Sequence, residues 1–291
     1  MTEYASWDFE EGEEIGPGRW VLKAIGGGNR YEVCLVWDAS LYALGVAKVL
    51  RPDQAEDEKA LRDLALEADA LDALAHPTLV RCFDAVLDGP RPHLLLEHLD
   101  GPSLRRLIKR DGAISPQQVL PLAAHVAGAL QYMVQAGYVH LDVKPDNIVM
   151  GLPPRLLDLS IARTLERAAR TEGPLGTDPY MAPEQCVGDG EIGPAADAWG
   201  LGATLFHAVA GEKPFAAGSG DGGPERFPQL VEDPRELPSH VPAELRDLVF
   251  EMLARDPAAR PSCGEVVERL QPLIDAQPRK LKLGRRGALG T

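Results

Sequence analysis

The first hundred residues alternate between short apolar runs and polar turns, which is typical of a strand-rich region with one helix. The run 31–37 is dense in aromatic and β-branched residues and follows the glycines at 26–28, so a hairpin is expected over 19–37. Between residues 54 and 75 the leucines are spaced by three, seven and three, which predicts a helix that ends before Pro77. Further strands are expected at 44–50, 79–87 and 93–97.

Beyond residue 100 the apolar pattern becomes helical. The loop 99–102 contains Gly-Pro and predicts a hinge between two parts of the chain. Ser115-Pro116 opens a long periodic stretch that Gly137 closes, which is a typical helix start and stop. Other helices are expected at 195–210, 241–254 and 263–274, with loops over 216–240. The fold class is therefore expected to be α+β and bilobal, with a β-rich N-lobe containing one helix (19–98) and an α-rich C-lobe (99–275).

Charge divides the chain into an acidic body and a basic end. The net charge is −14, so a protein that mainly grips nucleic acid backbones is improbable. The five basic residues in 279–286 belong to a basic C-terminal tail, 276–291, and the rest of the chain carries −19. The segment 1–18 is expected to be an acidic N-terminal extension. Two solvated, frayed termini are the simplest interpretation, and a tail that touches an anionic partner is the sharper one.

Targeting signals and cysteines indicate the cellular setting. No apolar run approaches the ~18–20 residues of a membrane helix, and the start lacks the basic and apolar stretches of a secretory signal. The four cysteines are scattered and form no C-x-x-C pair, which argues against a zinc cluster and a disulfide scaffold. A cytoplasmic location is therefore expected.

The segment His140-Leu141-Asp142-Val143-Lys144-Pro145-Asp146-Asn147 carries the strongest chemical signal. The carboxylate of Asp142 could orient an attacking hydroxyl and accept its proton, Lys144 could neutralise charge on a moving phosphoryl group, and Asn147 could hold a metal. Eleven residues later Asp158 follows an apolar pair, as a metal-holding Asp at a strand end would. These spacings predict phosphoryl transfer.

At this point the sequence resembles the eukaryotic-like (Hanks-type) Ser/Thr protein kinases of bacteria. The matches are the H-R-D-x-K-P-x-N loop at 140–147, the D-F-G motif at 158–160 and the A-P-E motif at 182–184. Val46-Ala47-Lys48 is similar to the family's strand lysine, and Glu67 lies where its partner is expected. The matches continue in order with Gly176-Thr177, the D-x-W-x-x-G motif at 197–202 and Arg260, over about residues 19–275.

The resemblance implies a bilobal kinase fold that binds ATP with Mg, or Mn, between the lobes. Catalytic roles would fall to Asp142, Lys144, Lys48 and Glu67. Asn147 and Asp158 would hold the metal, and Leu96 would be the gatekeeper beside the adenine. The implied nucleotide-binding residues are Ile25, Gly26, Gly28, Val33, Ala47, Lys48, Leu96, Glu97, Leu99, Asn147 and Asp158.

The resemblance also implies structural roles. Glu184 and Arg260 would form an ion pair, Asp197 would anchor the catalytic loop, and Thr177 would sit near that loop. His140 is expected to be a packed structural residue, because the family gives proton acceptance to the Asp position.

Three positions depart from the family pattern. Tyr31 replaces the third glycine of the glycine-rich loop, where small residues allow close approach to phosphates. Leu141 replaces the arginine that reads a phosphate on the activation segment, so activity is expected not to need phosphorylation there. Ser160 replaces the glycine of D-F-G, and a modest stiffening is expected. Arg30, at the loop tip, could supply compensating charge.

The favoured interpretation is a kinase that phosphorylates Ser or Thr of proteins. A pseudokinase that binds nucleotide and signals by shape is the first alternative, supported by the three departures. A small-molecule phosphotransferase is the second, disfavoured because A-P-E and D-x-W-x-x-G belong to the peptide-binding half of protein kinases. The sequence leaves the substrate and the oligomeric state open, and it does not decide whether the chain is part of a longer receptor.

Overall fold

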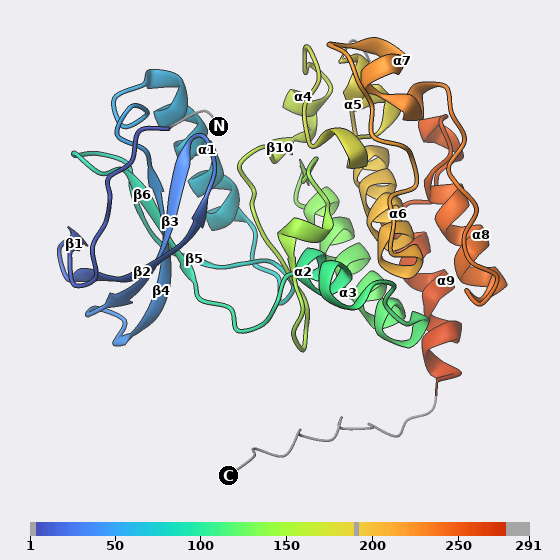
Figure 1. Cartoon of the computed structure of the whole chain (residues 1–291), viewed down its shortest axis with the longest axis horizontal. Coiled ribbons are helices and arrows are strands. Elements are labelled where there is room, and N and C mark those ends of the chain that lie inside the picture. The colour runs from blue at the N-terminus through green and yellow to red at the C-terminus, as the bar shows by residue number, and fades with distance from the viewer. Residues whose placement is uncertain (1–3, 189–191, 278–291) are drawn as a thin grey trace.

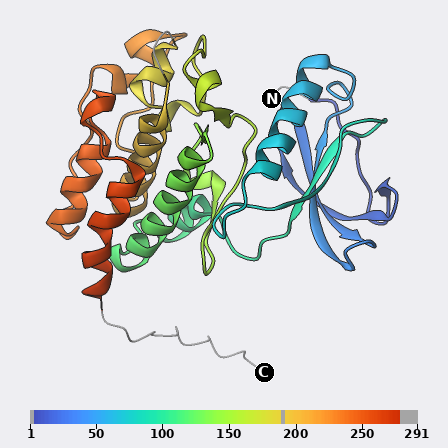
Figure 2. The same ribbon diagram turned by 180° about the vertical axis from the view of Figure 1, so that it is seen from behind.

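The computed structural model describes residues 4–188 and 192–277. It has two lobes, a β-rich one formed by the first hundred residues and a helical one formed by the rest (Figures 1 and 2). The bilobal α+β kinase fold expected from the sequence is confirmed. The basic tail residues from 278 onward lie outside the described residues.

The N-lobe is a six-stranded antiparallel sheet with the strand order β1-β2-β3-β4-β6-β5. Its helix α1 (Glu58–Ala73) starts later than the periodicity predicts, because the side chain of Asp57 caps the backbone N–H of Ala60 at 2.7 Å. The strands are β1 (Glu14–Gly16), β2 (Arg19–Gly27), β3 (Tyr31–Asp38), β4 (Ala43–Leu50), β5 (Cys82–Val86) and β6 (His93–Glu97).

Alternation along the strands gives the sheet two buried faces. The inner face joins α1 and the helical lobe in one continuous apolar core, which includes Leu50, Leu64 and Leu94. The outer face has its own apolar cluster, with Cys34, Val36 and Val49 fully buried. A sheet buried on both sides holds its register firmly, because a one-residue slip would exchange the two faces.

The N-terminal segment covers this outer face, which differs from the frayed end that the sequence predicts. Trp7 and Phe9 pack against the outer cluster, and the indole N–H of Trp7 donates to the carbonyl of Leu50 at 2.7 Å. The guanidinium of Arg91 lies 5.2 Å from the Trp7 ring and 5.1 Å from the Phe9 ring. We call residues 4–13 the N-terminal strap. Its acidic residues predict an exposed end, but two aromatic side chains between them cover apolar surface.

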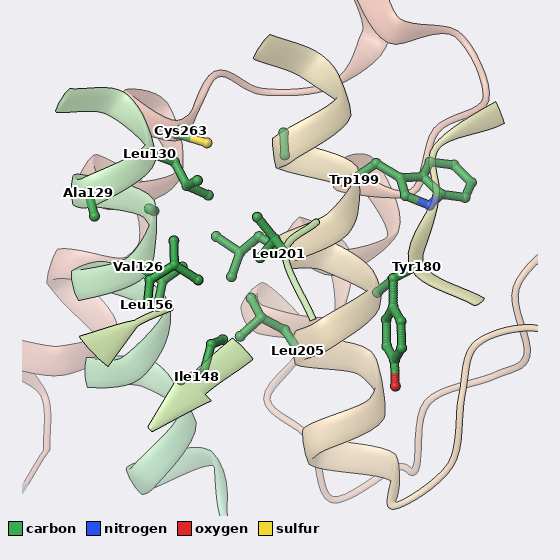
Figure 3. Close-up of a cluster of buried hydrophobic side chains, with 14 of the residues drawn as sticks. Val126, Ala129, Leu130, Ile148, Leu156, Tyr180, Trp199, Leu201, Leu205 and Cys263 are labelled. Carbon is green, nitrogen blue, oxygen red and sulfur yellow. The ribbon is translucent and has the colours of Figure 1, made fainter. Parts of the chain in front are cut away.

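The C-lobe is built around α6 (Pro194–Ala210), which is apolar on all sides and therefore central. Figure 3 shows Val126 and Leu130 of α3 facing Leu201 and Leu205 of α6. The other helices are α2 (Leu104–Asp111), α3 (Pro116–Gln135), α4 (Leu165–Ala168), α5 (Pro183–Val187), α7 (Gly223–Arg226), α8 (Ala243–Met252) and α9 (Cys263–Asp275). Short pairs and turns complete the lobe: β7 (Tyr138–Val139), β8 (Ile148–Val149), β9 (Arg155–Leu156), β10 (Arg163–Thr164), η1 (Pro145–Asn147), η2 (Asp178–Tyr180), η3 (Pro228–Leu230) and η4 (Pro257–Ala259).

Two glycines allow α6 to approach its neighbours closely. A Cβ at Gly202 would lie 2.8 Å from the Cβ of Met252 on α8, and one at Gly200 would lie 3.2 Å from Val143 of the 140–147 segment. A larger residue at Gly200 would push the 140–147 segment away from α6. Within 4–188 and 192–277, no helix is both long enough and apolar enough to cross a bilayer.

Candidate active site

Three charged residues from distant parts of the chain meet between the lobes. The ammonium of Lys48 donates to both carboxylate oxygens of Glu67 at 2.8 Å and to Oδ1 of Asp158 at 2.9 Å. Lys48 comes from β4, Glu67 from α1, and Asp158 from the loop after β9. We call this group the nucleotide-side cluster. It forms only when α1 is docked and the 158–160 loop is turned inward.

Burial makes these charges interdependent. Desolvation opposes the charge on Lys48, but Glu67 and Asp158 outweigh it and raise the pKa of the lysine above its usual value. Desolvation also acts against ionisation of Asp158, yet the Lys48 ammonium holds the pKa of this carboxyl below its usual range. The lysine and Asp158 are therefore both charged at neutral pH. Burial raises the pKa of Glu67 above its usual value, against the opposing effect of the Lys48 ammonium. Both oxygens of Glu67 nevertheless accept from that ammonium, which requires the carboxylate form. One ammonium against two carboxylates leaves an excess of negative charge.

A second polar group lies in the C-lobe, and we call it the substrate-side cluster. The ammonium of Lys144 donates to Oδ2 of Asp142 and to Oγ1 of Thr177, both at 2.6 Å. The Thr177 hydroxyl donates to Oδ1 of Asp142 at 2.7 Å, so both oxygens of the carboxylate are held. The amide of Asn147 donates to the backbone carbonyl of Asp142 at 3.0 Å and to its Oδ2 at 3.1 Å.

The backbone of this segment is anchored from below by α6. The buried carboxylate of Asp197 accepts the backbone N–H groups of His140 at 2.8 Å and Leu141 at 2.7 Å. His140 is fully buried, and its Nδ1 accepts the backbone N–H of Asp142 at 3.2 Å. Asp197 thus lies as expected of an anchor, and the ring of His140 supports the loop from inside the core.

Strained backbone occurs on both sides of the site. Leu141 has φ +66° and Asp158 has φ +64°, in the left-handed region that non-glycine residues seldom adopt. Such conformations persist only where surrounding contacts determine them. For Leu141 these contacts are the Asp197 carboxylate and the side chain of Gln185, which donates to the Leu141 carbonyl at 2.9 Å.

Cross-strand register defines the inner face of the sheet above the site. Val33 lies opposite Lys48, and Val46 lies opposite Leu96, so these four side chains share one face. Ala47 is on the other face, buried in the outer cluster beside Val49. The expectation that Ala47 contacts the nucleotide is therefore wrong. Side chains alternate along β4, and the residue on the Lys48 side is Val46.

The glycine-rich turn shows which glycine the backbone requires. Gly27 has φ +149°, and a Cβ there would lie 2.6 Å from the carbonyl of Tyr31. A Cβ at Gly26 or Gly28 would meet nothing within 4 Å. The space beside these two glycines fits the close approach of a phosphate to backbone N–H groups, whereas Gly27 is needed for the turn itself.

The bulky residue of the turn points inward. Lys48 Nζ lies 4.5 Å from the centre of the Tyr31 ring, which is a cation–π geometry. Burial raises the pKa of Tyr31 to about 12. Arg30 pairs with Asp63 of α1 at 2.7 Å, so its charge is already shared with a carboxylate. This weakens the idea that Arg30 compensates for the missing glycine.

The connector between the lobes carries the remaining expected residues. Leu96 and Leu99 pack partly buried against the main core, and Ile25 is exposed in β2, next to the glycines of the turn. The carboxylate of Glu97 forms an ion pair with Arg155, which also donates to the carbonyl of Leu79 at 2.7 Å. Glu97 therefore fixes the connector to the C-lobe through its side chain.

A family profile described as "Protein kinase domain" matches residues 20–270. The chain belongs to the protein kinase family. It is 32% identical over 249 residues to "Serine/threonine-protein kinase PknB" of Mycobacterium leprae, covering 81% of this chain and 39% of that protein. It is also 32% identical over 259 residues to "Probable serine/threonine-protein kinase PkwA" of Thermomonospora curvata, covering 88% and 34%.

A third relative is "Serine/threonine-protein kinase PkaA" of Streptomyces coelicolor, 32% identical over 235 residues, which cover 78% of this chain and 42% of that protein. This kinase domain thus spans between a third and about two fifths of the length of the curated relatives that it matches. The resemblance to bacterial Ser/Thr protein kinases that the motifs predict is confirmed.

The residues expected to bind a metal are Asp158 and Asn147. Oδ1 of Asp158 is used by Lys48, while Oδ2 of Asp158 and Oδ1 of Asn147 accept no hydrogen bond from the described residues. Carboxylate and amide oxygens are ligands that Mg²⁺ prefers, and the excess negative charge beside them favours a cation. The residues present therefore fit a divalent metal.

Two residues of this kinase site were not found from the sequence. Gln185 links three segments, since its amide nitrogen donates to Leu141 and Leu175 and its oxygen accepts the backbone N–H of Ala182. Its only signal is its place directly after the A-P-E motif. Arg51 donates to the carbonyls of Gly28 and Ala5, so it ties the glycine turn to the N-terminal strap. Glu184 and Arg260 form the expected ion pair at 2.6 Å.

Proposed function

We propose that this chain is a Ser/Thr protein kinase domain that transfers the γ-phosphate of ATP to protein hydroxyls. The observation that carries the proposal is the simultaneous formation of the two clusters, with Lys48 on Glu67 and Asp158, and Asp142 on Lys144 and Thr177. A small-molecule phosphotransferase is not favoured, because the Glu184–Arg260 pair and α6 build the peptide-binding half typical of protein kinases.

In this mechanism Asp142 orients the substrate hydroxyl and accepts its proton. The hydroxyl oxygen forms a bond to the γ-phosphorus while the bond to the leaving ADP oxygen breaks, and ADP keeps the electron pair. Lys144 holds positive charge beside the transferred group, and Thr177 fixes the direction of the Asp142 carboxylate. Glu67 holds Lys48 where the α- and β-phosphates would bind.

The nucleotide would bind between the lobes, along the connector and under the glycine turn. Asn147 and Asp158 would hold Mg²⁺, or Mn²⁺, which when bound supplies positive charge against the phosphate oxygens. The proposed contacts come from both lobes: Ile25, Gly26, Gly28, Val33, Val46, Leu96, Glu97 and Leu99. We also keep the lobes as 19–98 and 99–275 and propose a cytoplasmic location, which the four free thiols support.

We further propose that activity does not require phosphorylation of the activation segment. Leu141 replaces the phosphate-reading arginine and is buried. The segment is held instead by contacts that involve no phosphate: Gln185 donates to the Leu175 carbonyl at 2.8 Å, and the buried Thr171 hydroxyl accepts from the guanidinium of Arg163 at 3.1 Å. Phosphatase treatment, with the phosphate loss verified by mass spectrometry, should change activity by less than about two-fold. A large loss would overturn this part of the proposal.

The experiment for the main proposal is Mg-dependent transfer of labelled γ-phosphate from ATP to the chain itself and to a generic protein acceptor. Asp142→Asn runs in parallel as the matched control, because it keeps the size and most hydrogen bonds of the carboxylate. Loss of a catalytic base lowers the rate by about 10²–10⁴-fold. ATP binding without any transfer by the unchanged chain would indicate the pseudokinase alternative.

A further inference from the structure

A basic hollow lies on the C-lobe where α2 passes the end of α6. It has a volume of about 620 Å³, and its lining includes Arg105, Arg106 and Lys109 of α2 and His207 of α6. Lys213 is close enough for its charge to act on His207. Four cations therefore gather at one place on a chain whose net charge is −14.

The cations of α2 that line this hollow are without acidic partners. Arg105, Arg106 and Lys109 form no ion pair with any residue in the ranges 4–188 and 192–277. By contrast, Arg110 on the same helix pairs with Asp111 at 2.6 Å. Unpaired cations grouped around a concavity in an acidic protein indicate an anionic ligand.

Helix stability does not explain the two arginines. Arg105 and Arg106 lie in the first turn of α2, which contains no acidic residue. The start of a helix carries a partial positive charge, so cations there are unfavourable by a few tenths of a kcal/mol or more. Lys109, in the last turn, does have a favourable position for the helix. The two arginines need another reason to be there.

The hollow adjoins the substrate-side cluster. The Tyr180 hydroxyl bonds to Nδ1 of His207 at 2.7 Å, and Figure 3 shows the ring of Tyr180 lying along α6. Tyr180 is three residues after Thr177, which donates to Asp142. In addition, α2 packs against the turn η1 that follows Lys144. A peptide bound with its hydroxyl at Asp142 would have flanking residues within reach of these elements.

His207 contributes as a neutral group. Burial, with the nearby charges of Arg105 and Lys213, lowers the pKa of His207 to about 4. The ring is therefore uncharged at neutral pH, and the positive charge of the hollow comes from the arginines and lysines.

We propose that this hollow binds acidic residues that flank the phosphorylated Ser or Thr, so that the substrates of this kinase domain are acidic protein segments. The inference rests on the proposed function and gives it a substrate class. It differs from what the net charge of the acidic body predicts, since that charge would favour basic substrates at long range. Direct ion pairs at the hollow determine the preference instead, because charges in contact are much less screened by salt than distant ones. A phosphorylated residue offers the same chemistry as Asp or Glu.

The test uses peptides with one central Ser and with Glu, phosphoserine, Gln or Lys scanned through the flanking positions. Variants are Arg105→Gln, Arg106→Gln and Lys109→Gln, singly and combined, with Arg110→Gln as the matched control on the same helix. An exposed ion pair contributes about two- to five-fold. The unchanged chain should prefer the best Glu peptide over its Gln counterpart by about ten-fold in kcat/KM, and the triple variant by less than two-fold.

Binding is measured separately by the anisotropy of a fluorescein-labelled Glu peptide, so the hollow is tested even if no phosphate is transferred. Weaker binding in the triple variant with Arg110→Gln unaffected supports the inference. Equal binding of Glu and Gln peptides overturns it, while transfer to both leaves the kinase proposal intact. The inference would also be overturned if inorganic phosphate bound at the hollow and acidic peptides did not, because the hollow would then be a site for free anions. Tighter binding of phosphoserine peptides than of Glu peptides identifies phosphorylated segments as the ligands of the hollow.

Discussion

The two polar clusters of the site are built in opposite ways. In the nucleotide-side cluster, Lys48 reaches partners that are 19 and 110 residues away in sequence and belong to both lobes. In the substrate-side cluster, Asp142 and Lys144 are two residues apart, and both are held by the C-lobe. The first cluster exists only in one arrangement of the lobes, whereas the second is preorganised within one lobe.

The clusters also differ in charge balance. Lys48 faces two carboxylates, so the nucleotide side carries excess negative charge that a cation could neutralise. Asp142 and Lys144 balance each other, and Thr177 satisfies both. Changes on the nucleotide side should therefore affect metal use, nucleotide binding and stability together. Changes on the substrate side should affect transfer alone.

The largest effect is expected from Asp158→Asn. The variant removes the carboxylate proposed to hold the metal and leaves Glu67 as the anionic partner of Lys48. Loss of a charged group that acts in the transition state costs about 10²–10³ in kcat. Activity measured against Mg²⁺ concentration should show this loss together with a higher Mg²⁺ requirement. An unchanged Mg²⁺ requirement would mean that Asp158 does not hold the ion.

The next effect concerns the local cluster. Thr177→Val removes the hydroxyl that bridges Lys144 and Asp142 and should lower kcat by about 10–10²-fold, because hydrogen bonds to charged groups are worth about 1.5–3 kcal/mol. Nucleotide affinity, measured by titration of a fluorescent ATP analogue, should not change. Thr177→Ser keeps the hydroxyl and should restore most of the rate. Full activity in Thr177→Val would show that these hydrogen bonds do not matter, and equal loss in both variants would show that the methyl group matters as much as the hydroxyl.

Glu67→Gln tests whether the nucleotide side couples activity to stability. The amide keeps a hydrogen bond to Lys48 but loses the charge, so kcat/KM for ATP should fall by about ten-fold. The free energy of unfolding in urea should fall by about 1–3 kcal/mol, because Lys48 and Glu67 are both buried. Thr177→Ser serves as the comparison with unchanged stability. Unchanged stability in Glu67→Gln would show that the docking of α1 does not depend on this ion pair.

Local motifs made the substrate-side cluster predictable from the sequence. The residues 140–147 are adjacent in the chain, so their spacing alone brings Asp142 and Asn147 together. Family resemblance then supplied Lys48 and Glu67. The prediction for Ala47 is wrong because a short apolar run does not reveal which residues face inward, and only the register of β4 with β3 and β6 decides this.

Other features depend on contacts that no local pattern reveals. Helix α2 was not predicted, since 104–111 is mostly polar and basic and is helical through its Ser103 cap and its packing on the C-lobe. The sequence predicts a frayed end where the strap lies, because Trp7 finds its partner Leu50 only across 43 residues. The Arg30–Asp63 pair likewise joins two elements whose approach the sequence does not specify.

The strap gives the nucleotide side a support that the substrate side lacks. Trp7→Ala removes packing on the outer cluster and the hydrogen bond to Leu50, two residues from Lys48. Because Trp7 is half-buried, the free energy of unfolding should fall by roughly 1–3 kcal/mol in urea titration. Tyr4→Ala, at an exposed aromatic of the same strap, is the control and should have little effect. No change in Trp7→Ala would mean that the strap does not hold the sheet.

The smallest effect is expected at Tyr31. Tyr31→Leu removes the ring that faces the Lys48 ammonium, while Tyr31→Phe keeps it. A cation–π contact contributes about 0.5–1 kcal/mol, so KM for ATP should rise two- to five-fold in the Leu variant and stay unchanged in the Phe variant. A lower KM in Tyr31→Leu would instead show that the ring obstructs the nucleotide. In that case the space beside Gly26 and Gly28, and not the hold on Lys48, would limit nucleotide binding in this kinase domain.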